Sequence, residues 1–211
     1  MRKIFKNILV IVSLGTTMLF MQSCSNVPDV RVRRMMGEMS LRQKVCQMFV
    51  VRPEAMMLNG QKTGSRTYVT SLDSCMTEVF KEYPAGGFCL FAGNIKTPEQ
   101  TLLFTKELHA LEPTPLLCID EEGGRVARLA LNGSFGLKSF GSMGGLAAAA
   151  GESGVYEASR YIGEYTRHYG FDVDFAPVAD VNTNPDNVVI GTRAFSSDPE
   201  VAARMVVSCL K

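Results

Sequence analysis

The chain has 211 residues, with 22 Lys and Arg against 21 Asp and Glu, so its formal charge is +1. This balance gives no general attraction to nucleic acid, and 46% hydrophobic with 20% charged residues excludes a mainly disordered chain. The length suits a single domain, but it falls short of the roughly 250 residues of a complete (β/α)8 barrel.

The first 23 residues have the pattern of a signal peptide. A basic start precedes the largely apolar run Ile8–Met21, which is short for a membrane span but suits an export signal. Ser23 followed by Cys24 resembles the lipobox of bacterial lipoproteins, in which the cysteine is lipidated. We therefore expect a signal peptide over 1–23, a tether over 24–35 and an exported, membrane-anchored lipoprotein in the periplasm or at the cell surface. A plain secretory signal with an incidental cysteine is the alternative.

Cysteine and histidine residues give no sign of a metal centre. Five cysteines follow Cys24, and no two of them are spaced as C-x-x-C. The odd count and the apolar neighbours of Cys89 and Cys118 favour buried free thiols over disulfides. His109 and His168 stand apart on polar helical stretches, so we expect solvated helix residues, no metal and no cofactor.

The body of the chain alternates helical and strand patterns. Helices are predicted after the N-cap Ser40, over 72–83, from the N-cap Thr97 to about 111, over 152–169 and from Asp198 onward. Strands are predicted over 48–51, 87–91, 115–119 and within 171–181. Apolar strands alternating with helices predict a parallel α/β sheet with outer helices, either a doubly wound open sheet or a (β/α)8 barrel.

The last helical pattern continues to the end of the sequence. Residues 201–210 are rich in apolar side chains, and no Gly, Asn or Pro stop signal precedes Lys211. Four strands make half a barrel, which leaves two sheet edges exposed. We therefore expect a truncated chain whose residues 36–211 form roughly the first half of a TIM-like (β/α)8 barrel.

Polar residues at the carboxyl ends of parallel strands are the first candidates for a site. The sequence DEEGGRVAR (120–128) directly follows the third predicted strand. A carboxylate there can accept two sugar hydroxyl protons, glycine admits close approach and arginine offers a planar set of donors. A turn with surface charges is the alternative.

Two further positions extend this set. Asp174 lies inside an apolar run, and a buried carboxylate needs a partner, so we expect it to orient a neighbouring arginine. Arg193 follows a turn-rich loop and could reach back over the barrel mouth.

Four segments, in this order, resemble the N-terminal catalytic domain of glycoside hydrolase family 3, in its NagZ-like β-N-acetylhexosaminidase branch. They are MSLRQKVCQMFV (39–50), GGFCLFAGNI (86–95), IDEEGGRVARL (119–129) and DVDFAPVADVNTNPDNVVIGTRAF (172–195). The third segment fits the pattern D-(Q/E)-E-G-G-R-V-x-R, which favours this branch over the β-glucosidase branch.

The resemblance implies a TIM-like barrel that removes terminal β-linked N-acetylhexosamine from glycosides, including peptidoglycan fragments, without a metal. It implies that Asp120, Arg128 and Arg193 bind the sugar. It leaves Arg125 and Asp174 as scaffold residues.

One departure from the family pattern is large. The branch carries K-H-F-P-G-H-G on the next strand, then an Asp–His pair as general acid/base and a later Asp as nucleophile of a two-step retaining mechanism. None of these segments occurs in the 211 residues. We therefore expect no catalytic residue in this chain and no hydrolysis by it alone. The alternatives are a non-catalytic sugar-binding lipoprotein, a remnant, or an unrelated doubly wound binding domain.

Overall fold

The computed structural model describes residues 28–57 and 68–211. The chain divides into two compact units, Met1–Val45 and Cys46–Lys211. The predicted signal peptide and the predicted lipidation site Cys24 lie outside the described residues. Within the described ranges, no helix has the length and apolar character needed to cross a bilayer.

The described part of the first unit is helical. Helix α2 covers Pro28–Glu38, and α3 begins at Leu41 and ends at Cys46. The predicted N-cap Ser40 is confirmed, because its Oγ accepts from the backbone N of Gln43 at 3.3 Å. Oε1 of Gln43 accepts in return from the backbone N of Ser40 at 2.9 Å, which completes a capping box.

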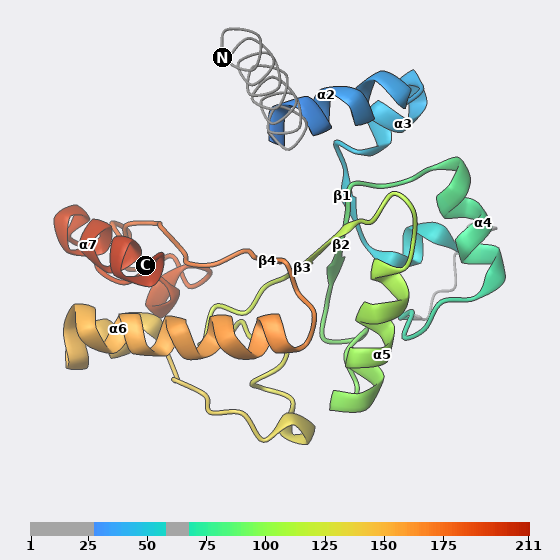
Figure 1. The fold of residues 1–211 in the computed structure, drawn as a ribbon. Helices are drawn as coiled ribbons and strands as arrows, with labels where there is room; N and C mark the ends of the chain where they lie inside the picture. Colours follow the sequence, from blue (N-terminus) through green and yellow to red (C-terminus); the bar gives the residue numbers. More distant parts are fainter. Residues whose placement is uncertain (1–27, 58–67) are drawn as a thin grey trace, which may run out of the picture. The chain divides into compact units, whose positions relative to one another are not determined.

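The second unit is built on a four-stranded parallel sheet (Figure 1). Its strands are β1 Val50–Val51, β2 Gly87–Leu90, β3 Leu116–Ile119 and β4 Val173–Asp174. The spatial order is β1-β2-β3-β4, with every pair parallel. A doubly wound sheet reverses its strand order at a switch point, whereas this order runs in one direction, as in a barrel. The expectation of a barrel-type sheet is confirmed, and the doubly wound alternative is wrong.

Helices follow the strands, as predicted. The second unit contains η1 Pro53–Met56, α4 Ser74–Glu82, α5 Pro98–His109, η2 Gly133–Phe135, α6 Met143–His168, η3 Gly191–Arg193 and α7 Pro199–Cys209. The predicted caps Thr97 and Asp198 each accept hydrogen bonds from backbone amides of the first turn. Helix α4 begins two residues later than predicted, because Asp73 accepts from the backbone N of Met76 and caps it.

Helix α6 is longer than the sequence predicts. It starts at Met143, with Ser142 as N-cap, and a non-helical Gly151 (φ 61°, ψ −158°) separates its first two turns from the predicted part. The stretch before Gly151 consists mostly of Gly and Ala, which show no apolar periodicity. This explains why the prediction over 152–169 missed the first segment.

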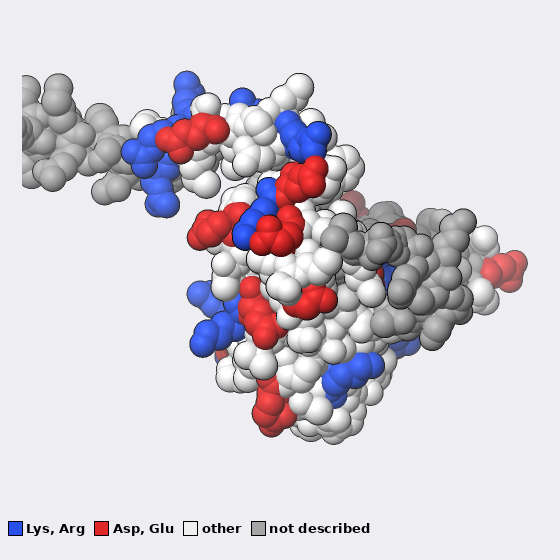
Figure 2. All heavy atoms as spheres, turned by 90° about the vertical axis from the view of Figure 1, so that its right-hand side faces the viewer, with Lys and Arg blue, Asp and Glu red and all other residues white. Residues whose placement is uncertain are grey.

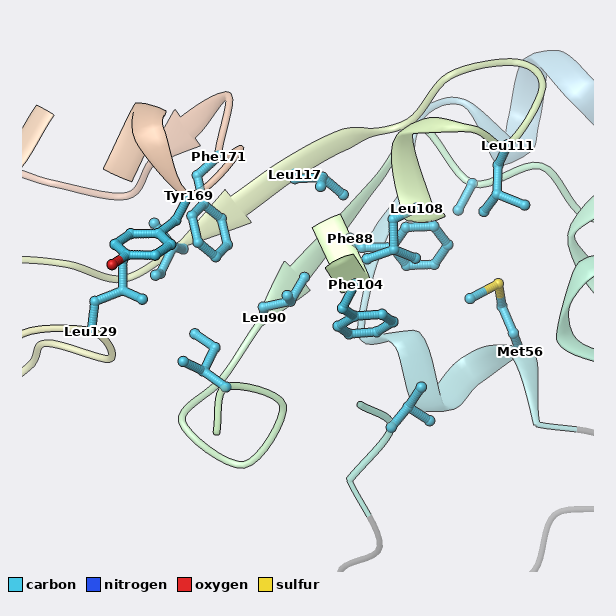
Figure 3. Close-up of a cluster of buried hydrophobic side chains, with 14 of the residues drawn as sticks. Met56, Phe88, Leu90, Phe104, Leu108, Leu111, Leu117, Leu129, Tyr169 and Phe171 are labelled. Atoms are coloured by element: carbon cyan, nitrogen blue, oxygen red, sulfur yellow. The ribbon is translucent and has the colours of Figure 1, made fainter. Parts of the chain in front are cut away.

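The main core lies between the sheet and its helices (Figure 3). Phe88 and Leu90 of β2 and Leu117 of β3 are fully buried there, as are Phe104 and Leu108 of α5. Alternation along the strands puts the intervening side chains on the opposite face of the sheet. Charged side chains of both signs are interspersed on the face that Figure 2 shows.

Candidate functional site

The carboxyl end of β3 carries an ion pair. Nη2 of Arg128 donates to Oδ2 of Asp120 at 2.8 Å, and both side chains are about one quarter exposed. Nε of Arg128 is buried and has no hydrogen-bond partner among the described residues. A buried donor without a partner costs about 1–3 kcal/mol. A ligand hydroxyl that accepts from this nitrogen would therefore be stabilised beside a carboxylate.

A second carboxylate fixes the loop that carries this arginine. Glu121 is fully buried and accepts from the backbone N of Arg128, from those of Leu129 and Ala130 at 2.9 Å each, and from the hydroxyl of Tyr165 at 2.7 Å. Burial and the charge of Glu121 raise the pKa of Tyr165, so the phenol stays protonated and donates. Sequence reasoning missed this role, because an acidic residue beside Asp120 has no local feature that separates it from surface charge.

Arg193 reaches the same rim through a third carboxylate. Its Nε and Nη2 donate to the two carboxylate oxygens of Glu122 at 2.8 and 2.6 Å, and Glu122 is buried. The hydrogen bonds to Glu122 raise the pKa of Arg193, and the charges of Asp180 and Asp120 act in the same direction. Arg193 thus bonds to the loop that begins with Asp120 and lies within electrostatic reach of Asp120, which pairs with Arg128, so the three predicted residues lie at the carboxyl end of β3. Their role in sugar binding stays a prediction.

Asp174 has a different partner from the one expected. Its Oδ1 accepts from the backbone N of Glu121 at 2.9 Å, so the prediction that it orients an arginine is wrong. The reason is strand pairing, because Asp174 lies opposite Ile119 and next to the amides that follow β3. Burial raises the pKa of Asp174 to about 7, and the charges of Glu121, Asp120 and Glu122 add to this effect.

Arg125 supports the loop that leads to Arg193. Its Nη2 donates to the backbone carbonyl of Val188 at 2.6 Å and also to that of Val189. These contacts are of the scaffold kind that the family resemblance implies for Arg125.

A small cavity is lined in part by the Glu122–Arg193 pair. Its volume is about 160 Å³, and its walls come from α6, α7 and the chain after β4. Its lining includes Ser159 and Cys209, whose Oγ and Sγ are 2.9 Å apart. Asp120 and Arg128 do not line it, so it is separate from their unsatisfied donor.

The two histidines differ from each other. Nε2 of His109 lies 2.8 Å from Oδ2 of Asp172, which also accepts from the backbone N of Leu117 at 2.8 Å. The expectation of a simple solvated residue is therefore wrong for His109, whose partner is 63 residues away. His168 is exposed, as predicted, and its ring packs edge-on against Tyr169 at 5.0 Å.

The cysteines of the described residues are free thiols, but not all are buried. Cys118 is buried, Cys75 is exposed and the other three are intermediate. Burial raises the pKa of Cys89 to about 11, with the charge of Asp120 as the next cause. The expectation of buried thiols holds for Cys118 and is wrong for Cys75, which lies in the first turn of α4. Across the described ranges, no group of three or more His, Cys, Asp or Glu side chains could hold a metal ion.

Comparison with known proteins identifies the family. The model of the glycosyl hydrolase family 3 N-terminal domain matches residues 40–211, so the chain belongs to this family. Beta-hexosaminidase A of Pseudoalteromonas piscicida is 32% identical over 152 residues, which are 69% of this chain and 25% of that protein. The beta-hexosaminidase of Aromatoleum aromaticum is 38% identical over 128 residues, which are 58% of this chain and 35% of that protein.

Solved structures of the same family share the fold. A family 3 beta-N-acetylglucosaminidase from Paenibacillus sp. str. FPU-7 matches with a TM-score of 0.66 and 30% identity, over 81% of this chain and 30% of that one. NagZ from Neisseria gonorrhoeae, in complex with N-trifluoroacetyl-D-glucosamine, matches with a TM-score of 0.59 and 27% identity. The match covers 67% of this chain and 42% of that one. The four parallel strands thus correspond to part of a family 3 barrel, and the matches span between 25% and 42% of the length of these relatives.

Proposed function

We propose that the chain binds a terminal β-linked N-acetylhexosamine at the rim formed by Asp120, Arg128 and Arg193. The observation that carries the proposal is the buried, unsatisfied Nε of Arg128 beside the carboxylate of Asp120. Oδ2 of Asp120 is bonded to Arg128, which leaves Oδ1 to accept a hydroxyl proton. The bidentate contact with Glu122 holds Arg193 in place as a third group.

The comparisons support the identity of the sugar. Relatives are beta-hexosaminidases by name, and one related structure holds an N-acetylglucosamine analogue. In the intact family, the reaction would be retaining hydrolysis of terminal N-acetylhexosamine from peptidoglycan or other glycan fragments. The general acid/base and the nucleophile belong to segments that these 211 residues do not include. The chain alone would therefore bind the sugar without cleaving it. The alternative function, a non-catalytic sugar-binding lipoprotein, predicts the same behaviour.

We further propose that the protein is exported and anchored to a bacterial membrane through lipidated Cys24. The basic start, the run Ile8–Met21 and Ser23 support this location. Metabolic labelling with a fatty-acid analogue tests it, because Cys24→Ala should abolish the label. A label that remains on the variant would refute anchoring at this residue.

Titration calorimetry of the 211-residue chain with N-acetylglucosamine tests the binding site. Arg128→Gln and Asp120→Asn should each weaken binding about tenfold or more, because each removes charge-assisted hydrogen bonds to the sugar. Arg204→Gln on α7 is the matched control, since Arg204 is exposed and its ion-pair partner in the described part of the chain is the exposed Glu152. A chromogenic N-acetyl-β-glucosaminide should release no product above buffer. Unchanged affinity in both site variants, or turnover, would contradict the proposal.

A further inference from the structure

A third arginine stands beside the proposed sugar site. Arg52 follows β1, and its Cζ lies 5.3 Å from the ring centre of Phe91, the residue that follows β2. Cζ of Arg128 lies 5.4 Å from the same ring centre. The two guanidinium carbons are therefore no more than about 11 Å apart. The carboxyl ends of three consecutive strands thus contribute Arg52, Phe91 and Asp120 to one rim.

One of the three guanidinium nitrogens of Arg52 is bonded to a carboxylate. Nε contacts Oε2 of Glu54 at 3.1 Å. Oε1 of Glu54 accepts from the backbone N of Val69 at 2.9 Å and from Nδ2 of Asn94 at 2.7 Å, so this carboxylate is fixed. The ring of Tyr68, 5.2 Å from Cζ, supports the guanidinium as well.

Among the described residues, no group engages the two terminal nitrogens of Arg52, which makes them candidate donors to a ligand. Neither Nη1 nor Nη2 has a hydrogen-bond partner within 28–57 and 68–211, and the side chain is 46% exposed. Glu54 contacts Arg52 through one oxygen only, and its other oxygen is bonded to Val69 and Asn94, so one carboxylate oxygen faces the whole guanidinium of Arg52. By contrast, Arg193 makes two hydrogen bonds to the buried carboxylate of Glu122, and the Arg128 side chain is only 23% exposed.

The charges of Asp120, Arg128 and Arg52 all act on one thiol, that of Cys89 in β2. After burial, the largest influence on its pKa is the charge of Asp120, which raises it, while the charges of Arg128 and Arg52 lower it. Asp120, Arg128 and Arg52 therefore all lie within electrostatic reach of one thiol in β2.

We propose that Arg52 extends the hexosamine site and binds an anionic substituent, a sulfate or a carboxylate, that the bound sugar carries. This inference rests on the proposed function. The planar pair Nη1 and Nη2 matches two oxygens of such a group, and Phe91 keeps the guanidinium beside Arg128. The site therefore selects acidic hexosaminides over neutral ones.

The test compares three sugars on the 211-residue chain by titration calorimetry. N-acetylglucosamine is the neutral reference, N-acetylglucosamine 6-sulfate carries a sulfate and N-acetylmuramic acid carries a carboxylate. At least one acidic sugar should bind about tenfold more tightly than the reference, and the preference should shrink as salt is raised. The acidic sugar that binds more tightly than N-acetylglucosamine identifies which anion, sulfate or carboxylate, the site binds.

Variants then assign the preference to Arg52. Arg52→Gln should remove it, and Arg52→Lys, which keeps the charge but loses the planar donors, should retain part of it. The exposed Arg204→Gln should keep it in full. Thermal unfolding of each variant shows that it is folded. If N-acetylglucosamine binds and neither acidic sugar binds more tightly, or if Arg52→Gln keeps the preference, the inference is overturned while the proposed function stands. If no sugar binds, both fail.

Discussion

The hydroxyl of Tyr165 donates to Oε1 of Glu121 at 2.7 Å, and both side chains are buried. This bond joins helix α6 to the loop after β3, 44 residues earlier in the chain. The same carboxylate holds three consecutive backbone amides, the first of them that of Arg128. The position of the proposed sugar-binding arginine therefore depends on a helix that contributes no side chain to the ion pair.

Tyr165→Phe should destabilise the chain by about 1–3 kcal/mol. The phenyl ring keeps its packing, but the buried carboxylate loses one of its four donors, and an unmet hydrogen bond to a charged group has this cost. Urea unfolding measures the difference in free energy. Tyr156→Phe is the matched control, because Tyr156 lies on the same helix with 38% of its surface exposed, and its change should stay within about 0.5 kcal/mol. Equal effects of the two substitutions would argue against a special role for the Tyr165 hydroxyl.

A glycine on α6 determines how closely η3 approaches. A Cβ added at Gly144 would lie 2.5 Å from the backbone O of Ala194 and 3.1 Å from that of Thr192, which flank Arg193. Gly144→Ala should therefore push Arg193 away from Glu122, lower the Tm and weaken binding of N-acetylglucosamine several-fold.

Gly163→Ala is the control that separates the steric effect of a Cβ at position 144 from the effect of alanine on helix propensity. Gly163 lies on the same helix, and apart from that helix's own backbone no described residue has an atom within 4 Å of its added Cβ. Alanine should stabilise this position by about 0.5–1 kcal/mol. Thermal unfolding and titration with N-acetylglucosamine, carried out on both variants, test these two predictions. A Gly144→Ala protein with normal stability and affinity would show that η3 can shift without cost.

Much of the fold follows from local pattern. Strands β2 and β3 are short, continuous apolar runs, and helices α5 and α7 start at the predicted caps Thr97 and Asp198. The first segment of α6 escaped prediction because Gly and Ala carry little apolar contrast. Strand order required the structure, since apolar parallel strands suit both an open sheet and a barrel.

The sequence motifs select Asp120, Arg128 and Arg193 as candidates, but not most of the hydrogen bonds that position them. Asp120 and Arg128 stand close together in one motif, so their pairing follows from local sequence. The partners of Asp174, His109 and Glu121 come from distant segments, up to 63 residues away. No local spacing predicts such bonds, because strand register and helix packing create them.

Substitution of Asp172 should lower the stability of the fold without changing the affinity for the sugar. It precedes β4, at the amino end of the strands, where it accepts from the backbone N of Leu117 and contacts His109. Asp172→Ala leaves that amide without its acceptor and should cost about 1–3 kcal/mol in unfolding free energy. Since the proposed site lies at the opposite end of the strands, the Kd for N-acetylglucosamine should not change. A weaker Kd in folded protein would show that the two ends are coupled.

Asp174 should make stability fall between about pH 4 and pH 7. Its pKa is about 7 in the folded chain, against the ordinary value of 3.8 expected in the unfolded chain. Between these values the folded chain keeps a proton that the unfolded chain has lost, so the unfolding free energy decreases as pH rises and levels off above about pH 7. Asp174→Asn cannot titrate and removes this contribution. The Tm of the wild-type chain relative to the variant should therefore drop by several degrees from pH 5 to pH 8 and stay constant from pH 8 to pH 9. A Tm difference that is constant from pH 5 upward would mean that Asp174 ionises normally in the folded chain.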